Sequence, residues 1–212
     1  MLRKISIVLA SAVLAAAPVA AGDFSGGYVG VFAGTQSAED VFHSDETEFM
    51  TTVEPSGTVY GFLLGYNHQD GNFVIGTEFE YGMSSVDEVL LASDPTNTFG
   101  YDISDEIGGV MRLRARFGYV LADDWMPFLA AGVSSTTTTI AADANAFIDV
   151  NRIGFGMGLG LDWQMTDTWS FRAEYYTEDF GSAVFNDYCY VCDTWDMNMS
   201  MDTARVSASM KF

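Results

Sequence analysis

The sequence has few cationic residues. Of its 212 residues only 9 are Lys or Arg, against 29 Asp and Glu, and the formal net charge is −20. Binding of DNA or RNA through the phosphates needs clustered cations, so this composition argues against a nucleic-acid partner. Disorder is also excluded, because 49% of the residues are hydrophobic and 14% are aromatic, which is ample apolar material for an ordered fold.

Beyond its first 21 residues the sequence lacks an apolar run long enough to cross a membrane as a helix. The longest such run is Phe128 to Val133, whereas a helical span needs about 20 residues. The N-terminus has Arg3 and Lys4, then an apolar core and small residues up to Ala21, which is the pattern of a secretory signal peptide. A membrane anchor is the weaker interpretation, because the core is too short to span. We expect export, cleavage near Ala21 and a mature domain over residues 22–212.

What the chain does contain is strict alternation. From Arg152 to Trp163 every second residue is large and apolar, and the intervening positions hold glycine, Arg152 and Asp162. Successive side chains of a strand point to opposite faces, so this segment predicts a strand with one apolar face. A phosphate-binding glycine loop is disfavoured, because the GxGxxG spacing and a following helix are missing. Seven more segments alternate, some of them weakly: Tyr28–Thr35, Val59–His68, Phe73–Met83, Val110–Tyr119, Pro127–Thr138, Trp169–Glu178 and Thr203–Phe212.

The segments that join these eight predicted strands alternate in length. Short turns are predicted at 69–72, 122–125 and 166–168, and long loops at 37–56, 84–106, 135–149 and 179–200. An even number of strands, with both termini at the short-turn end, closes a sheet without free edges. In a bilayer this closure is required, because an unpaired backbone group in hydrocarbon costs several kcal/mol. The sequence therefore predicts an all-β fold, an eight-stranded antiparallel up-and-down transmembrane β-barrel.

Three segments of the chain resemble a known family. RLRARFGYVLADDWMPFLAAGV, LGLDWQMTDTWSFRAEYYTEDFG and LGYNHQDGNFVIGTEFEYG are similar to the small outer-membrane β-barrel domain family, which includes the alphaproteobacterial outer-membrane immunogenic proteins and, more distantly, OmpA-type and OmpX-type barrels. The resemblance covers essentially the whole mature chain. It implies the outer membrane as location and Phe212 as the signal read by the barrel-assembly machinery. It implies no catalytic motif, and family members range from structural anchors to adhesins and host-interaction antigens, so the activity stays open.

The two faces of the predicted strands carry different side chains. Aromatic residues beside the short turns predict an interfacial girdle on the lipid side: Tyr66, Phe73, Phe117, Tyr119, Phe128, Trp163, Trp169 and Phe212. The cations of the mature chain all fall on the inward face, Lys211 among them. We expect an ion-pair network in the lumen, formed by Glu78, Glu80, Arg112, Arg114, Arg116, Arg152, Asp162, Arg172, Glu174 and Arg205. Eight strands enclose a space that side chains just fill, which predicts a plugged lumen, with an ion path as the alternative.

Most of the acids lie in or beside the predicted long loops. They are 20 of the 29 acids: Glu39, Asp40, Asp45, Glu46, Glu48, Glu54, Asp87, Glu88, Asp94, Asp102, Asp105, Glu106, Asp143, Asp149, Glu178, Asp179, Asp187, Asp193, Asp196 and Asp202. The simplest interpretation is a solvated acidic surface. Clustered carboxylates also suit Ca²⁺, so a divalent-cation site is the sharper alternative, although an EF-hand-like spacing is missing.

Cysteine and histidine are scarce. Cys189 and Cys192 lie in the fourth predicted long loop, and in an exported chain such a pair predicts a disulfide more readily than a redox or metal site. The two histidines are His43, in the first predicted long loop, and His68, at the short-turn end. An outer-membrane enzyme needs a nucleophile with an oriented base, and His43 with its neighbour Ser44 is a weak candidate pair, so we expect no enzyme.

These features predict a monomeric outer-membrane barrel without a cofactor and with a structural, envelope or cell-surface interaction role. The expected partners are outer-membrane lipids, lipopolysaccharide and the barrel-assembly machinery. Divalent cations or a host or surface ligand at the loops are further candidates. The alternative functions are a small-solute porin-like channel and, less favoured, a lipid A-modifying enzyme.

Overall fold

A computed structural model describes most of the mature chain. The described residues are 22–44, 50–90, 103–122, 124–142, 146–186 and 194–212. They form ten strands: β1 (Gly26–Ser44), β2 (Met50–Val53), β3 (Ser56–Asp70), β4 (Phe73–Ser84), β5 (Val86–Leu90), β6 (Ile103–Tyr119), β7 (Trp125–Ala142), β8 (Ala146–Gln164), β9 (Trp169–Asn186) and β10 (Thr194–Lys211). Within these residues, no helix is long and apolar enough to cross a membrane.

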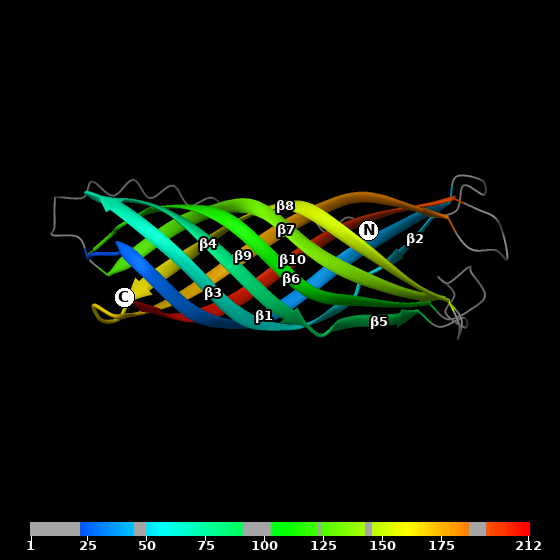
Figure 1. Ribbon diagram of the computed structural model, residues 1–212, viewed down its shortest axis with the longest axis horizontal. Helices are drawn as coiled ribbons and strands as arrows, with labels where there is room; N and C mark the ends of the chain where they lie inside the picture. Colours follow the sequence, from blue (N-terminus) through cyan, green and yellow to red (C-terminus); the bar gives the residue numbers. More distant parts are fainter. Residues whose placement is uncertain (1–21, 45–49, 91–102, 123, 143–145, 187–193) are drawn as a thin grey trace.

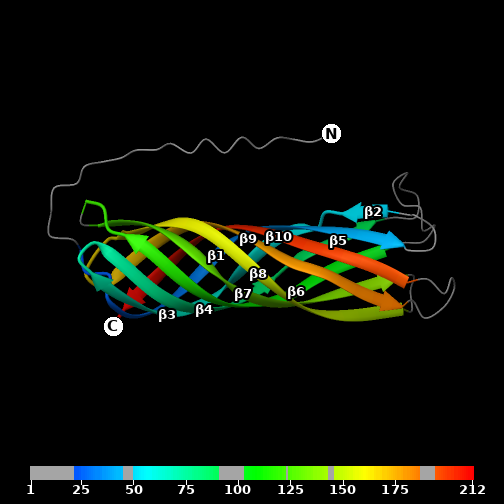
Figure 2. The same cartoon turned by 90° about the horizontal axis from the view of Figure 1, so that it is seen from above.

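Eight of the strands close on themselves. Each long strand pairs antiparallel with its neighbours in the order β1, β3, β4, β6, β7, β8, β9 and β10, and β1 then pairs with β10 (Figure 1). The predicted eight-stranded antiparallel barrel is therefore confirmed. The short strands β2 and β5 lengthen the sheet at the end away from the short turns (Figure 2). We call the end that holds the short turns and the start of β1 the short-turn end, and the opposite one the far end.

The alternation in the sequence gives the barrel wall two different faces. In β4 exposed and buried residues alternate almost without a break. In β8 the apolar residues point outward, and Ile153 keeps 78% of its surface exposed. Exposed apolar side chains over a whole barrel surface are stable only against lipid, so the outward face has the character of a membrane-spanning surface.

The inward glycines of β8 make room for large side chains from other strands. A Cβ atom on Gly156 would lie 2.5 Å from the ring of Tyr176, and one on Gly160 would lie 2.4 Å from the ring of Phe128. Both distances are far below van der Waals contact. The glycines of this strand thus leave the space that the rings of Tyr176 and Phe128 occupy, since interiors pack at crystal-like density.

The strands at the far end are longer than the sequence pattern predicts. The predicted long loop 135–149 is wrong over most of its length, because β7 continues to Ala142 and β8 begins at Ala146. Cross-strand hydrogen bonds support the extension: Thr137 donates to Asn151 over 2.9 Å and Thr139 donates to Asp149 over 2.8 Å. The other three predicted loops are likewise shortened by extensions of β1, β6, β9 and β10. The long strands therefore rise well beyond the about 9–11 residues that span a bilayer.

Aromatic side chains ring the barrel near the short turns. Trp125 and Trp163 stack on the outer surface with ring centroids 5.7 Å apart, and Phe73 packs edge-on against Tyr119 at 5.1 Å. Phe128 was predicted in this girdle, and that prediction is wrong. Its ring is 3% exposed and lies inside the lumen, because β7 carries Pro127 on the outward position instead.

Candidate functional site

The lumen holds the charged side chains of the barrel. The predicted network residues come from β4, β6, β8, β9 and β10, and the structure places all of them on the inward face, nine of them in one ion-pair network and Arg152 nearer the far end. All of them are buried: Glu78, Glu80, Arg112, Arg114, Arg116, Arg152, Asp162, Arg172, Glu174 and Arg205. Glu78 and Glu80 have no exposed surface at all. Charges removed from water this completely are stable only when they are paired and hydrogen-bonded.

Arg114 lies at the centre of the network. It contacts Glu80 and Glu174 at 2.5 Å each, and it also pairs with Glu78 on the neighbouring strand. The ring of Tyr176 lies 4.9 Å from its guanidinium carbon, close enough for a cation–π contact. One guanidinium therefore connects two carboxylates of β4 with one of β9 across the lumen.

A second layer lies toward the short-turn end. Asp162 accepts hydrogen bonds from Arg116 at 2.5 Å and from Arg172 at 2.6 Å. Arg172 also donates a hydrogen bond to Glu78 at 2.8 Å, which joins this layer to the Arg114 layer. Below the two arginines the ring of Phe128 lies 4.0 Å and 5.1 Å from their guanidinium carbons. Planar guanidinium groups stack well on aromatic faces, which explains why this phenylalanine is inside.

A third layer lies toward the far end. Arg112 donates to both carboxylate oxygens of Glu178, at 2.8 Å and 2.5 Å. Arg205 donates to Glu174 at 2.7 Å and pairs with Glu80. Glu178 was predicted among the surface acids beside the fourth loop, and this is wrong: it is 2% exposed. The alternation of β9 continues inward past Tyr176, so Glu178 keeps the inward parity.

Above the third layer most of the side chains in the lumen are apolar, and two charged residues are buried among them. Seven buried side chains fill it: Ala38, Val86, Ile107, Val110, Phe180, Met199 and Met201. Arg152 lies in this half and donates to the backbone carbonyls of Gly181 and Met197 at 3.4 Å and 3.3 Å. Asp40 also lies here with no exposed surface, so its assignment to the acidic surface is wrong too.

The short-turn end is closed by the segment that precedes β1. Phe24 packs against Val74, Val120 and Met126, and its backbone N–H donates to the Gln69 side chain at 2.8 Å. Beside this apolar plug lies a pocket of about 30 Å³, enough for roughly one or two water molecules.

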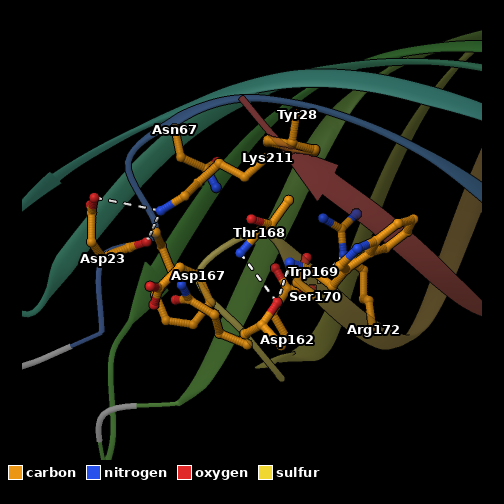
Figure 3. Close-up of a pocket in the computed structure, with 13 residues that line it drawn as sticks. Asp23, Tyr28, Asn67, Asp162, Asp167, Thr168, Trp169, Ser170, Arg172 and Lys211 are labelled. Carbon is orange, nitrogen blue, oxygen red and sulfur yellow. Dashed lines mark hydrogen bonds and ion pairs between the residues drawn. The ribbon is translucent and has the colours of Figure 1, made fainter.

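Figure 3 shows the polar walls of this pocket. Lys211 reaches toward Asp23 at one side, with an ion-pair distance of 3.5 Å, while Asp162 and Arg172 lie at the other. The Ser25 backbone N–H donates to Asp23 and lowers the pKa of that carboxyl, and the Lys211 ammonium acts in the same direction. Lys211 therefore pairs at the mouth, whereas the arginines pair in the lumen.

The ionic side chains of the lumen balance one another. Five arginines, Arg112, Arg114, Arg116, Arg172 and Arg205, form ion pairs with five carboxylates, Glu78, Glu80, Asp162, Glu174 and Glu178. Such an arrangement can hold strands together and exclude water. Among the described residues no group of three or more His, Cys, Asp and Glu side chains is placed to hold a metal ion.

Several predicted features fall elsewhere. Cys189 and Cys192 lie outside the described residues, as does the leader 1–21, so the disulfide and the signal peptide stay predictions. His43 lies on β1 rather than in a loop. Phe212 is 74% exposed, and its backbone N–H donates to Gly27 at 2.9 Å beside the start of β1. The role of Phe212 as the signal that the barrel-assembly machinery recognises stays a prediction.

Comparison with known proteins places this architecture in a family. Residues 6–212 match the family described as outer membrane protein beta-barrel domain. The 31 kDa outer-membrane immunogenic protein of Brucella melitensis is 27% identical over 215 residues, which cover 93% of this chain and 87% of that protein. The 22 kDa outer membrane protein of Rhizobium leguminosarum is 27% identical over 198 residues, with 91% and 80% covered.

Solved structures share the fold at low sequence identity. Neisserial surface protein A has a TM-score of 0.52 and 15% identity, and the match covers 89% of this chain and 98% of that one. The outer membrane protein OprG from Pseudomonas aeruginosa has a TM-score of 0.53 and 11% identity, with 90% and 99% covered. These similarities concern the fold alone.

Proposed function

Since the chain belongs to the outer membrane protein β-barrel domain family, we propose that it is a closed, non-conducting barrel that displays an acidic surface outside the cell. Its location is the outer membrane, as for its relatives. Barrels of this membrane have short turns on the periplasmic side and longer connections outside, so the far end faces the exterior.

The charge-balanced, filled lumen carries the proposal of closure. The ion pairs around Arg114 occupy the middle of the barrel, and Phe180 with Met199 and Met201 fills the half above it. An ion that entered would have to displace paired charges and then pass between closely packed, mostly apolar side chains, and both steps are unfavourable.

Planar-bilayer recording of the purified full-length protein tests closure. We expect no steady open events in 1 M KCl, under conditions in which a general porin inserted in parallel conducts. Fluorescently labelled protein should be used, so that insertion is counted independently of current. Steady unitary openings in proportion to the inserted protein would refute the closed lumen and favour the small-solute channel.

The extended strands at the far end support the proposed surface role. They carry exposed acids on their outward side: Glu39, Glu54, Glu106, Asp149, Asp179 and Asp202. The name of the Brucella relatives calls them immunogenic, which agrees with exposure at the cell surface. We propose that this surface contacts molecules outside the cell without catalysing a reaction. A catalytic site would need an accessible nucleophile with a base beside it, whereas the described ionic side chains of the lumen pair with one another.

Cysteine labelling on intact cells tests the orientation. In a Cys189→Ser, Cys192→Ser background, Asp149→Cys should react with a membrane-impermeant maleimide on whole cells. Its matched control, Asp70→Cys at the short-turn end, should react only after the outer membrane is opened. The reverse pattern would place the acidic end in the periplasm and remove the surface role.

A further inference from the structure

The outward face of β8, β9, β10 and β1 is hollowed. Small side chains, Ala33, Ala173 and Ala204, line a depression of about 620 Å³, and Tyr175 and Leu161 are among its larger lining residues. A second hollow of about 450 Å³ shares Leu161 and Ala173 and continues toward the short-turn end. We call the two together the alanine groove. Because this face spans the membrane, the groove is open to the hydrocarbon of the bilayer.

An acidic residue lies at the outer end of the alanine groove. Asp202 precedes Ala204 by two residues on β10, so both side chains are on the outward face, and Asp202 is exposed. Tyr175 pairs with Ala204 across the ladder, and its hydroxyl is near enough to the Asp202 carboxylate for the two groups to interact electrostatically. The carboxylate therefore lies beside a residue of the groove itself, at the level where the apolar surface ends.

Two further exposed acids surround Asp202. Glu39 on β1 and Asp179 on β9 both pair with Ser200, one outward position above Asp202 on β10. Each is therefore a diagonal neighbour of Asp202, about 7–8 Å away on the sheet face, while Glu39 and Asp179 are two strand spacings, roughly 10 Å, from each other. The arginines of the mature chain are buried in the lumen, and Lys211 lies at the opposite end. We call Glu39, Asp179 and Asp202 the acidic patch.

We propose that the alanine groove and the acidic patch together bind an outer-leaflet lipid whose headgroup carries an ammonium group. An acyl chain fills the hollow that the alanines leave, since an unfilled apolar hollow forfeits dispersion contacts. The ammonium donates charge-assisted hydrogen bonds to Asp202 and its neighbours, and such bonds are strong where water is partly excluded. A lipid with an anionic headgroup is repelled by the same carboxylates.

Charge argues against a second copy of the chain as the occupant. A two-fold contact between two barrels brings the same surface of each partner together. In a dimer whose two grooves face each other, the acidic patch of one barrel would lie beside that of the other. Like charges across an interface disfavour association. An amine-bearing lipid supplies the opposite charge and an acyl chain in one molecule.

Native mass spectrometry of the detergent-purified full-length protein tests the proposal. Phosphatidylethanolamine and phosphatidylglycerol with identical acyl chains serve as probes, in the presence of EDTA. We expect phosphatidylethanolamine to be retained about tenfold more, a factor that corresponds to about 1.4 kcal/mol. Asp202→Asn should remove most of this preference. Glu106→Gln, which neutralises an exposed acid on β6 across the barrel, is the matched control and should keep it.

A second variant tests the groove separately from the charge. Ala204→Trp fills the hollow and should lower the retention of both lipids; Ala173→Leu replaces it if the tryptophan variant does not show the mobility of a folded barrel. Equal retention of the two lipids by the unmodified protein, or an unchanged preference in Asp202→Asn, would overturn the proposal. Two other results would also overturn it. If added Mg²⁺ made the protein retain phosphatidylglycerol, the acidic patch would bind a metal ion rather than an ammonium group. If the unmodified protein formed a lipid-free dimer that Ala204→Trp abolished, the groove would bind a second copy of the chain. Closure of the lumen plays no part in these outcomes.

Discussion

Replacing Arg114 by Met removes the central cation of the lumen while keeping a long side chain. Three carboxylates then lose a partner at once, since Arg114 contacts Glu78, Glu80 and Glu174. The site is fully buried, so water cannot take over the lost contacts. We expect the variant to fold into the same barrel but to unfold at a lower temperature.

The expected loss lies near the lower limit for a broken buried pair. Removing one partner of such a pair costs about 3–5 kcal/mol. Here each carboxylate keeps another arginine: Glu78 keeps Arg172 at 2.8 Å, Glu174 keeps Arg205 at 2.7 Å, and Glu80 also keeps Arg205. We therefore expect about 3 kcal/mol, which corresponds to a decrease of about 6–12 °C in a chain of this size.

Heat-modifiable gel mobility measures this decrease. The folded barrel and the unfolded chain migrate differently, so the temperature at which half of the folded band converts after a fixed incubation can be read directly. Leu113→Met, which changes the outward neighbour of Arg114, is the control and should change this temperature little. Adding Glu80→Gln to Arg114→Met should restore part of the loss, because it removes one uncompensated charge. An unchanged conversion temperature in Arg114→Met would refute the idea that the network stabilises the barrel.

Three further predictions use the same gel assay, which reports both the conversion temperature and the yield of the folded band. Gly160→Val should abolish the folded band, since its Cβ atom would lie 2.4 Å from the ring of Phe128 and 2.8 Å from the backbone oxygen of Ala173, which the paired strand holds in place; outward substitutions on β8 should fold normally. Glu178→Ala should lower the conversion temperature by roughly 6–12 °C, from about 3 kcal/mol, whereas Asp179→Ala, its exposed neighbour, should lower it by no more than about 2–4 °C, from under about 1 kcal/mol. Phe24→Ala should lower it by several degrees, because a buried aromatic of the mouth is lost; equal behaviour to the unmodified protein would show that the mouth plug contributes nothing.

The two-residue period of the sequence is enough to predict the fold and much of the lumen. In β8 and β6 every second residue has the same character, so parity assigns a face to each side chain without further information. Arg112, Arg114 and Arg116 follow directly from this rule, and the structure places all three inside. A closed barrel leaves few other arrangements, because every backbone group in the membrane must be paired.

Parity does not tell where a strand ends. Polar residues alternate on the far extensions as they do in loops, which is why the sequence assigns Asp40 to a loop; Glu178 is the last residue of its predicted strand and is assigned to the surface because it borders the predicted loop. Both lie on the inward face of their strands. Phe128 was misplaced for a related reason: beside Pro127 its parity is ambiguous, and an aromatic residue near a short turn suits a girdle. What decides its position is the pair of guanidinium groups above it, which belong to other strands and cannot be read locally.

The distribution of charge follows from the architecture. A filled lumen has to be close to neutral, because unpaired charges there are not solvated, and the outward face has to be apolar against lipid. At the short-turn end Lys211 meets Asp23, and Asp70, Asp124 and Asp167 are exposed there. The exposed acids of the far extensions, among them Glu39, Asp149 and Asp202, give the face at the far end the larger negative charge among the described residues, with a range of about 8 Å at physiological salt. A partner of that face should therefore be cationic, and its association should weaken as salt is raised.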